Sequence, residues 1–232
     1  MTRLAVIVYC ALVPLSAASL TFPNGSAGVE GSTSVSGLFN TAPATFQFVW
    51  SSSQLGALTI GDQITGIRFR QDGPGSSASP GSSFTNYTIA VSASANPIGS
   101  LSTTFASNVS GTATVVRTGS LTFAPGDFPG GSSPNAFGPL ITFTTPHAYT
   151  GGDLLFTITH SGGTGFFSAD VTFNAALGDI VVASSDTATT GSFGPGIAVI
   201  GQLEFDVAVP EPATYAVSAI GLLVIAALRR RG

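Results

Sequence analysis

The sequence predicts an all-β fold, an antiparallel β-sandwich of jelly-roll-like type, with a hydrophobic segment at either end of the chain. Apolar residues recur at every second position through much of residues 19–208, which is the periodicity of half-buried strands. Clusters of glycine, proline and serine separate these stretches, as turns require. No helical period of useful length appears between the two hydrophobic ends.

The alternation predicts about ten strands. The alternation is clearest at residues 45–50, where Phe46, Phe48 and Trp50 lie on one face of the expected strand. One helical turn is expected near residues 52–58. The C-terminal stretch is expected to be one continuous strand, with Ile197, Val199, Leu203, Phe205 and Val207 on one face and Gln202, Glu204 and Asp206 on the other. The expected strands are residues 45–50, 67–70, 87–93, 113–117, 120–123, 140–144, 154–160, 166–173, 179–183 and 197–207.

Two long loops rich in glycine, proline and serine interrupt the strands, at residues 71–83 and 126–139. The first is typical of flexible low-complexity sequence. The second carries Phe128 and Phe137, which need a place to pack. We expect it to cover the sandwich, with a ligand-facing rim as the alternative.

Residues 1–18 are predicted to be a secretory signal peptide. Arg3 supplies the positive charge, residues 4–15 are apolar, and small residues precede a cleavage position after Ala18 or one residue later. Cys10, the only cysteine, lies inside this segment. The mature protein therefore has no disulfide and no thiol for catalysis.

The other end of the chain is predicted to enter a membrane as a transmembrane helix over residues 213–228. This run carries no charge and would be about 24 Å long as a helix, short of the ~30 Å hydrocarbon core. Arg229, Arg230 and Arg231 follow it, which places the C-terminus in the cytoplasm. Pro210 and Pro212 hold the segment before the helix extended.

Pro210-Glu211-Pro212, the apolar run and the three arginines together resemble the PEP-CTERM sorting signal of Gram-negative bacteria. The resemblance covers residues 209–232. It implies that an exosortase, a membrane cysteine peptidase, recognises Pro210, Glu211 and Pro212, and that Arg229, Arg230 and Arg231 are the cytoplasmic stop. A plain C-terminal anchor with a proline-rich linker is the alternative. Residues 64–162 also look like a recurrent ectodomain of such proteins, which supports β-structure and adds no catalytic residue.

The net charge of the predicted extracytoplasmic domain, residues 19–208, limits which partners it can bind. This segment has three arginines, no lysine and ten acidic residues, a net charge of −7. Nucleic acid is not expected as a partner, because phosphate binding needs a basic surface.

No residue pattern indicates catalysis, so we expect no enzyme, no catalytic residue, no cofactor and no metal site. His147 and His160 are expected to be exposed or hydrogen-bonded, although a hairpin would bring them together. Several loop aspartates adjoin glycine, which favours a role in turns, with calcium binding as the alternative; these are Asp62, Asp72, Asp127, Asp153 and Asp179.

Trp50 is expected in the core, although exposed aromatic rings stack on sugars in carbohydrate-binding sandwiches. The sequence as a whole predicts a protein exported through the inner membrane, anchored briefly and then processed to the cell surface or outside. There it would be a structural or interaction protein of the surface or exopolysaccharide matrix. Its transient partners would be exosortase and the inner membrane, with extracellular polysaccharide as a further partner. A carbohydrate-binding module is the alternative, and a hydrolase is less favoured.

Overall fold

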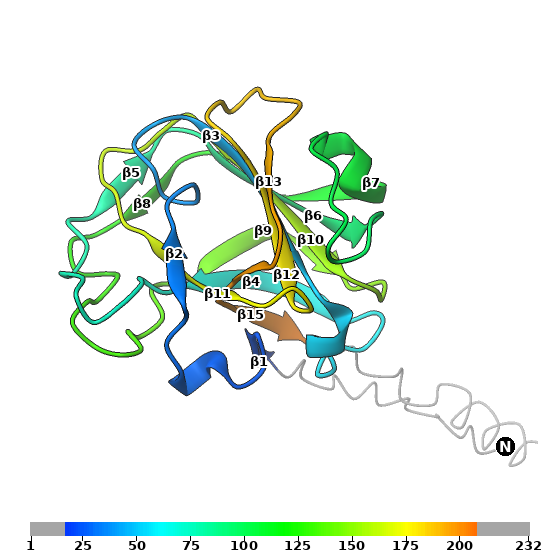
Figure 1. The fold of residues 1–232 in the computed structure, drawn as a ribbon, viewed down its shortest axis with the longest axis horizontal. Helices are drawn as coiled ribbons and strands as arrows, with labels where there is room; N and C mark the ends of the chain where they lie inside the picture. Colours follow the sequence, from blue (N-terminus) through cyan, green and yellow to red (C-terminus); the bar gives the residue numbers. More distant parts are fainter. Residues whose placement is uncertain (1–16, 208–232) are drawn as a thin grey trace, which may run out of the picture.

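The computed structural model describes residues 17–207, which form an all-β domain with fifteen strands and three short 3₁₀ helices in that range (Figure 1). Every strand pairing within the described residues is antiparallel. The predicted all-β antiparallel class is therefore confirmed, and the jelly-roll topology stays a prediction.

The largest sheet has six strands with β3 and β10 at its centre, where Phe156 lies opposite Phe48. Both central strands have strand neighbours on each side, and all seven residues of β3 are buried because apolar clusters pack against both faces of the strand. In order across the sheet the strands are β13 (Ser192–Gly194), β12 (Gly178–Ala183), β3 (Ala44–Trp50), β10 (Leu154–His160), β6 (Tyr87–Ser94) and β7 (Val109–Arg117).

Three smaller sheets complete the domain. The four-stranded sheet runs β1 (Ala17–Phe22), β15 (Gly201–Asp206), β4 (Gln63–Phe69) and β9 (Ile141–Ala148). The three-stranded sheet runs β14 (Ile197–Val199), β11 (Ala169–Phe173) and β2 (Thr33–Val35), and β5 (Ser82–Phe84) pairs with β8 (Leu121–Phe123). The 3₁₀ helices are η1 (Ser26–Gly28), η2 (Ser52–Gln54) and η3 (Phe105–Asn108).

The expected single strand over residues 197–207 is wrong, because the chain changes sheet at Ile200. Residues before it pair with β11, and residues after it pair with β1 and β4. The Ile200 amide still donates to β11, at the Asp170 carbonyl, over 3.0 Å. Residues 198–201 are all buried, so the alternation seen in β15 does not extend through the change of partner.

The main core lies where all four sheets bring apolar side chains together. Trp50 is fully buried there, stacks on Phe22 with ring centroids 4.5 Å apart, and donates from Nε1 to the Val199 carbonyl at 2.9 Å. The prediction that Trp50 belongs to the core is confirmed. A second cluster covers the other face of β3, where Val49 packs with Leu155.

Gly201 of β15 lies close against the Trp50 ring. A Cβ there would lie 2.9 Å from Trp50 Cζ2, closer than real Cβ contacts allow, and 3.1 Å from the Arg68 carbonyl oxygen, which is tighter than most. We expect Gly201→Ala to lower the free energy of unfolding by about 1–3 kcal/mol through overpacking, measured by urea denaturation.

Gly56→Ala is the matched control, since no atom lies within 4 Å of a Cβ at Gly56. It should change stability by no more than about 0.5 kcal/mol. Equal effects of the two substitutions would show that the fit against Trp50 does not limit stability.

Candidate functional site

A buried ion pair joins the end of β4 to β11. Arg70 follows β4, Asp170 lies in β11, and both side chains are fully buried with 2.7 Å between Arg70 Nη2 and Asp170 Oδ2. Arg70 Nε donates to the same oxygen at 2.7 Å. Arg70 Nη1 and Nη2 also donate to the carbonyls of Ser26 and Val29, so Arg70 fixes the η1 segment as well.

Backbone pairing along β11 brings distant segments to Asp170. Gln71 forms an isolated bridge with Ala169, and the Asp72 amide donates to the Ser168 carbonyl at 3.0 Å. On the other side, the Gly31 amide donates to Asp170 Oδ2 at 3.1 Å. The residues just before β2 and just after β4 are thereby held beside β11.

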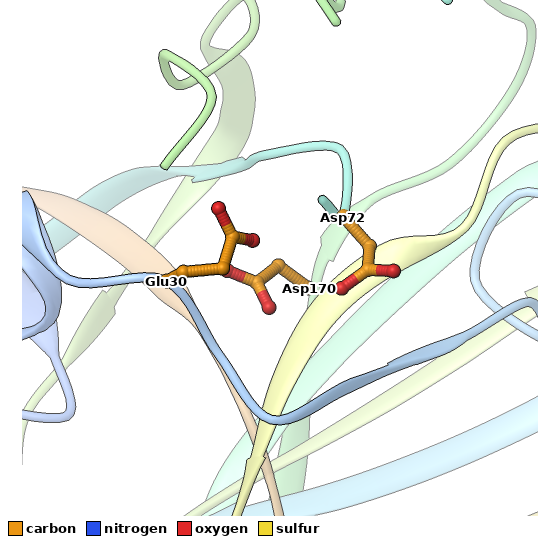
Figure 2. Close-up of side chains that lie close together, drawn as sticks. All are labelled: Glu30, Asp72 and Asp170. Carbon is orange, nitrogen blue, oxygen red and sulfur yellow. The ribbon is translucent and has the colours of Figure 1, made fainter. Parts of the chain in front are cut away.

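Three carboxylates gather at this junction, one each from Glu30, Asp72 and Asp170 (Figure 2). One oxygen from each residue lies within 4.8 Å of the others. Glu30 Oε1 accepts from the Gly73 amide at 3.0 Å, whereas Glu30 Oε2 and Asp170 Oδ1 are buried without a hydrogen-bond partner. We call these three residues the acidic cluster.

The acidic cluster is under-neutralised, because three carboxylates face one guanidinium. Burial raises the pKa of Asp170 to about 6, although Arg70 opposes the shift. Burial also raises the pKa of Asp72, and the charge of Glu30 adds to this effect. The arrangement can therefore hold a cation or share protons.

A hollow of about 450 Å³ adjoins the acidic cluster, and Asp72 lines it. The segment 71–80 forms one wall, and residues 166–168 form another. Phe166 is 48% exposed at this hollow. The lining therefore combines one accessible aromatic ring with polar side chains and backbone.

The loop 126–139 holds the wall of the hollow in place. Asn135 Nδ2 donates to the carbonyls of Gln71 and Gly73 at 3.1 and 3.0 Å. Phe128 is fully buried with its ring centroid 3.9 Å from that of Phe167. The expectation that this loop covers the sandwich is confirmed for Phe128, and the loop fixes residues that sequence composition assigns to a flexible segment.

The predicted loop aspartates divide into three groups. Asp62 and Asp127 each accept from a backbone amide three residues earlier, at 2.8 and 2.7 Å, as a turn role requires. Asp153 and Asp179 accept from amides of other segments, those of Ser52 and of Gly99 and Gly196. Only Asp72 belongs to the acidic cluster.

Glu30 and Asp170 were not among the predicted site residues. The available signal was a single acid between the apolar residues Ala169 and Val171, where a strand buried on both sides would need a partner for its charge.

His147 and His160 lie in different sheets, so the hairpin that would join them does not form. His160 is buried, bonds the Gly37 carbonyl through Nε2 at 2.9 Å and accepts from the Gly162 amide. His147 Nδ1 contacts Thr114 Oγ1 at 3.1 Å. The expectation of hydrogen-bonded histidines is confirmed.

Because these two histidines are buried, we expect the protein to lose stability on acidification. Burial lowers the pKa of His160 and of His147 below their ordinary 6.5. The unfolded chain then takes up protons first as pH falls below about 6.5, so the free energy of unfolding decreases, by up to about 1.4 kcal/mol per pH unit for each histidine. His160→Gln keeps a donor for Gly37 and should flatten this dependence in urea titrations between about pH 7.5 and 5.5.

Asp170 has the opposite effect on the pH dependence of stability. Its raised pKa lets the folded state bind a proton before the unfolded chain does, which stabilises the folded state as pH falls. The quantity to compare is therefore the difference in free energy of unfolding between the wild type and His160→Gln at each pH. If this difference does not vary with pH, His160 is not a neutral, buried histidine.

Removing one partner of the buried ion pair should be strongly destabilising. Arg70→Met leaves the Asp170 carboxylate buried without its cation, and we expect a loss of about 3–5 kcal/mol in urea unfolding. Arg68→Met is the control, since Arg68 pairs with Glu204 at 3.3 Å on the partly exposed face. Arg68→Met should lower the free energy of unfolding by no more than about 1 kcal/mol. Similar losses in the two variants would contradict a larger role of the buried pair than of the partly exposed pair.

The two ends of the described chain lie side by side. Ala17 is opposite Asp206 and Ala18 is opposite Phe205 in the pairing of β1 with β15. The predicted cleavage position after Ala18 thus falls within β1. Within residues 17–207, none of the helices has the length and apolar character to cross a membrane. The predicted span 213–228, and with it Pro210, Glu211, Pro212, Arg229, Arg230 and Arg231, lies outside the described residues.

Comparison with known families finds the PEP-CTERM protein-sorting motif at residues 208–231. No match was found among curated proteins or among solved structures. The family match thus concerns the C-terminal segment, and the β-domain has to be interpreted from its own geometry.

Proposed function

We propose that this chain, a PEP-CTERM sorting-signal protein and thus a C-terminally sorted exosortase substrate, is a structural or interaction protein of the cell surface or exopolysaccharide matrix. The β-domain is then the cargo, and its role is non-enzymatic. The observation that carries the proposal is the direct connection of the matched motif to the domain, since Val207 alone separates it from β15.

The connection favours a mechanical role for the domain. β15 is an inner strand of the four-stranded sheet, paired with β1 on one side and β4 on the other. A force applied through the C-terminus would load two ladders of hydrogen bonds along the strand at once. Such an attachment suits a protein that is held by its C-terminus at a surface.

The pairing of β1 is compatible with signal-peptide removal. Cleavage after Ala18 would leave residues 19–22 opposite residues 201–204. Leu20 and Phe22 are buried in the core, which would keep the new N-terminal segment in the sheet. The mature N-terminus would then lie beside the strand that leads to the sorting motif.

Processing is tested by the intact mass of the protein recovered from its host. We expect a mature species that lacks both residues 1–18 and the three C-terminal arginines. Replacing Pro210, Glu211 and Pro212 together by alanine should preserve the C-terminus, because the recognition motif is lost. Pro97→Ala, in a loop of the β-domain, is the control and should be processed normally. A wild-type species that retains Arg229–Arg231 in full would contradict processing.

Carbohydrate binding is a second candidate, favoured by the exposed ring of Phe166 beside the hollow. We expect the purified mature protein to be retained on host polysaccharide, and Phe166→Ala to weaken retention about tenfold through lost stacking. Phe173→Ala is the matched control, because Phe173 is 60% exposed and is not among the residues that line the hollow. Absent retention, or equal effects of the two substitutions, would contradict binding at the hollow.

A further inference from the structure

We propose that Glu30, Asp72 and Asp170 form a binding site for a hard divalent cation, Ca²⁺, which would join the η1–β2 segment, the end of β4 and β11. These residues make up the acidic cluster (Figure 2), and the site does not depend on the sorting signal.

The spacing of the carboxylates suits one ion. Protein oxygens bind Ca²⁺ at about 2.3–2.6 Å, so two ligands on opposite sides of one ion are about 5 Å apart. One oxygen from each residue of the acidic cluster lies within 4.8 Å of the other two. A common ion can therefore reach all three without rearrangement of the strands.

Two buried oxygens lack any other partner. The side chain of Asp170 has no exposed surface, and its Oδ2 already accepts from Arg70 and from Gly31. Its Oδ1 is buried in the acidic cluster with no hydrogen bond, and so is Glu30 Oε2. A buried carboxylate oxygen normally has a donor or a metal, because water no longer solvates it.

The charge of the junction matches a divalent ion. Three carboxylates and Arg70 leave two negative charges when all four groups are ionised, and Arg70 is committed to Asp170 Oδ2. The competing way to reduce this charge is a proton shared between Asp72 and Asp170. A bound ion and a shared proton can be distinguished experimentally, because only the bound ion depends on added cation.

The ligand set favours Ca²⁺ over Mg²⁺. The three carboxylates come from different segments, and the fixed guanidinium occupies one side of Asp170. Ca²⁺ accepts such irregular oxygen sets and completes its shell with water, whereas Mg²⁺ demands a nearly ideal octahedron. Asp72 also lines the hollow, which gives solvent and ions a route to the acidic cluster.

The test is calorimetric titration of the purified, chelator-treated mature protein with CaCl₂ near neutral pH. We expect one Ca²⁺ per chain, with a dissociation constant of roughly 0.1–1 mM, as in extracellular modules. Thermal unfolding should shift upward in CaCl₂, because the ion binds the folded state. No binding in this range would overturn the proposal in favour of the shared proton.

Asp72→Asn is the informative variant, because Asp72 is only partly buried and its loss spares the ion pair. It should weaken Ca²⁺ binding by roughly tenfold or more and abolish the thermal shift. Asp127→Asn, an acid in the 126–139 loop whose carboxylate accepts from Ala124, should leave both unchanged.

Unchanged binding in Asp72→Asn would overturn the assignment to the acidic cluster. Titration with MgCl₂ under the same conditions should show weaker binding. Equal affinity for Mg²⁺ would overturn the assignment to Ca²⁺.

Discussion

The buried ion pair between Arg70 and Asp170 is the interaction on which the acidic cluster and its surroundings depend. A buried charge must be matched by an opposite charge and by hydrogen bonds, or its desolvation is not offset. Arg70 meets this requirement by binding Asp170 and the carbonyls of the η1 segment together. Asp170 in turn accepts from Gly31 and, through its backbone carbonyl, from Ile200. One pair of charges thus fixes four segments that are far apart in the sequence.

The hollow owes its shape to a second set of constraints. The segment 71–80 is rich in glycine and serine, and such a segment alone would not hold one conformation. Asn135 donates to two carbonyls of this segment, those of Gln71 and Gly73. Phe128 anchors the covering loop in the core. The two long loops therefore act as one unit, joined by the hydrogen bonds of the buried Asn135 and by aromatic packing of Phe128. Phe166 remains accessible beside this unit.

The sorting signal and the domain meet at β15. Because β15 is an inner strand, the motif is joined to the part of the sheet that has partners on both sides. The change of sheet at Ile200 makes this possible, since it places β14 beside β11 and β15 beside β4. The same change brings Gly201 against Trp50, in the centre of the core.

The sequence by itself determined the features that are local in the chain. Side-chain alternation identified β10 with its observed bounds and placed Trp50 in the core, because strand periodicity is a property of neighbouring residues. The sorting motif was readable for the same reason, as residues 208–231 are contiguous. Only the tertiary structure decided what depends on pairing between distant strands. It split residues 197–207 between two sheets, and it brought Glu30, Asp72 and Asp170 together across up to 140 positions of sequence. No local pattern encodes such a meeting, because it follows from which strands pair and in which register.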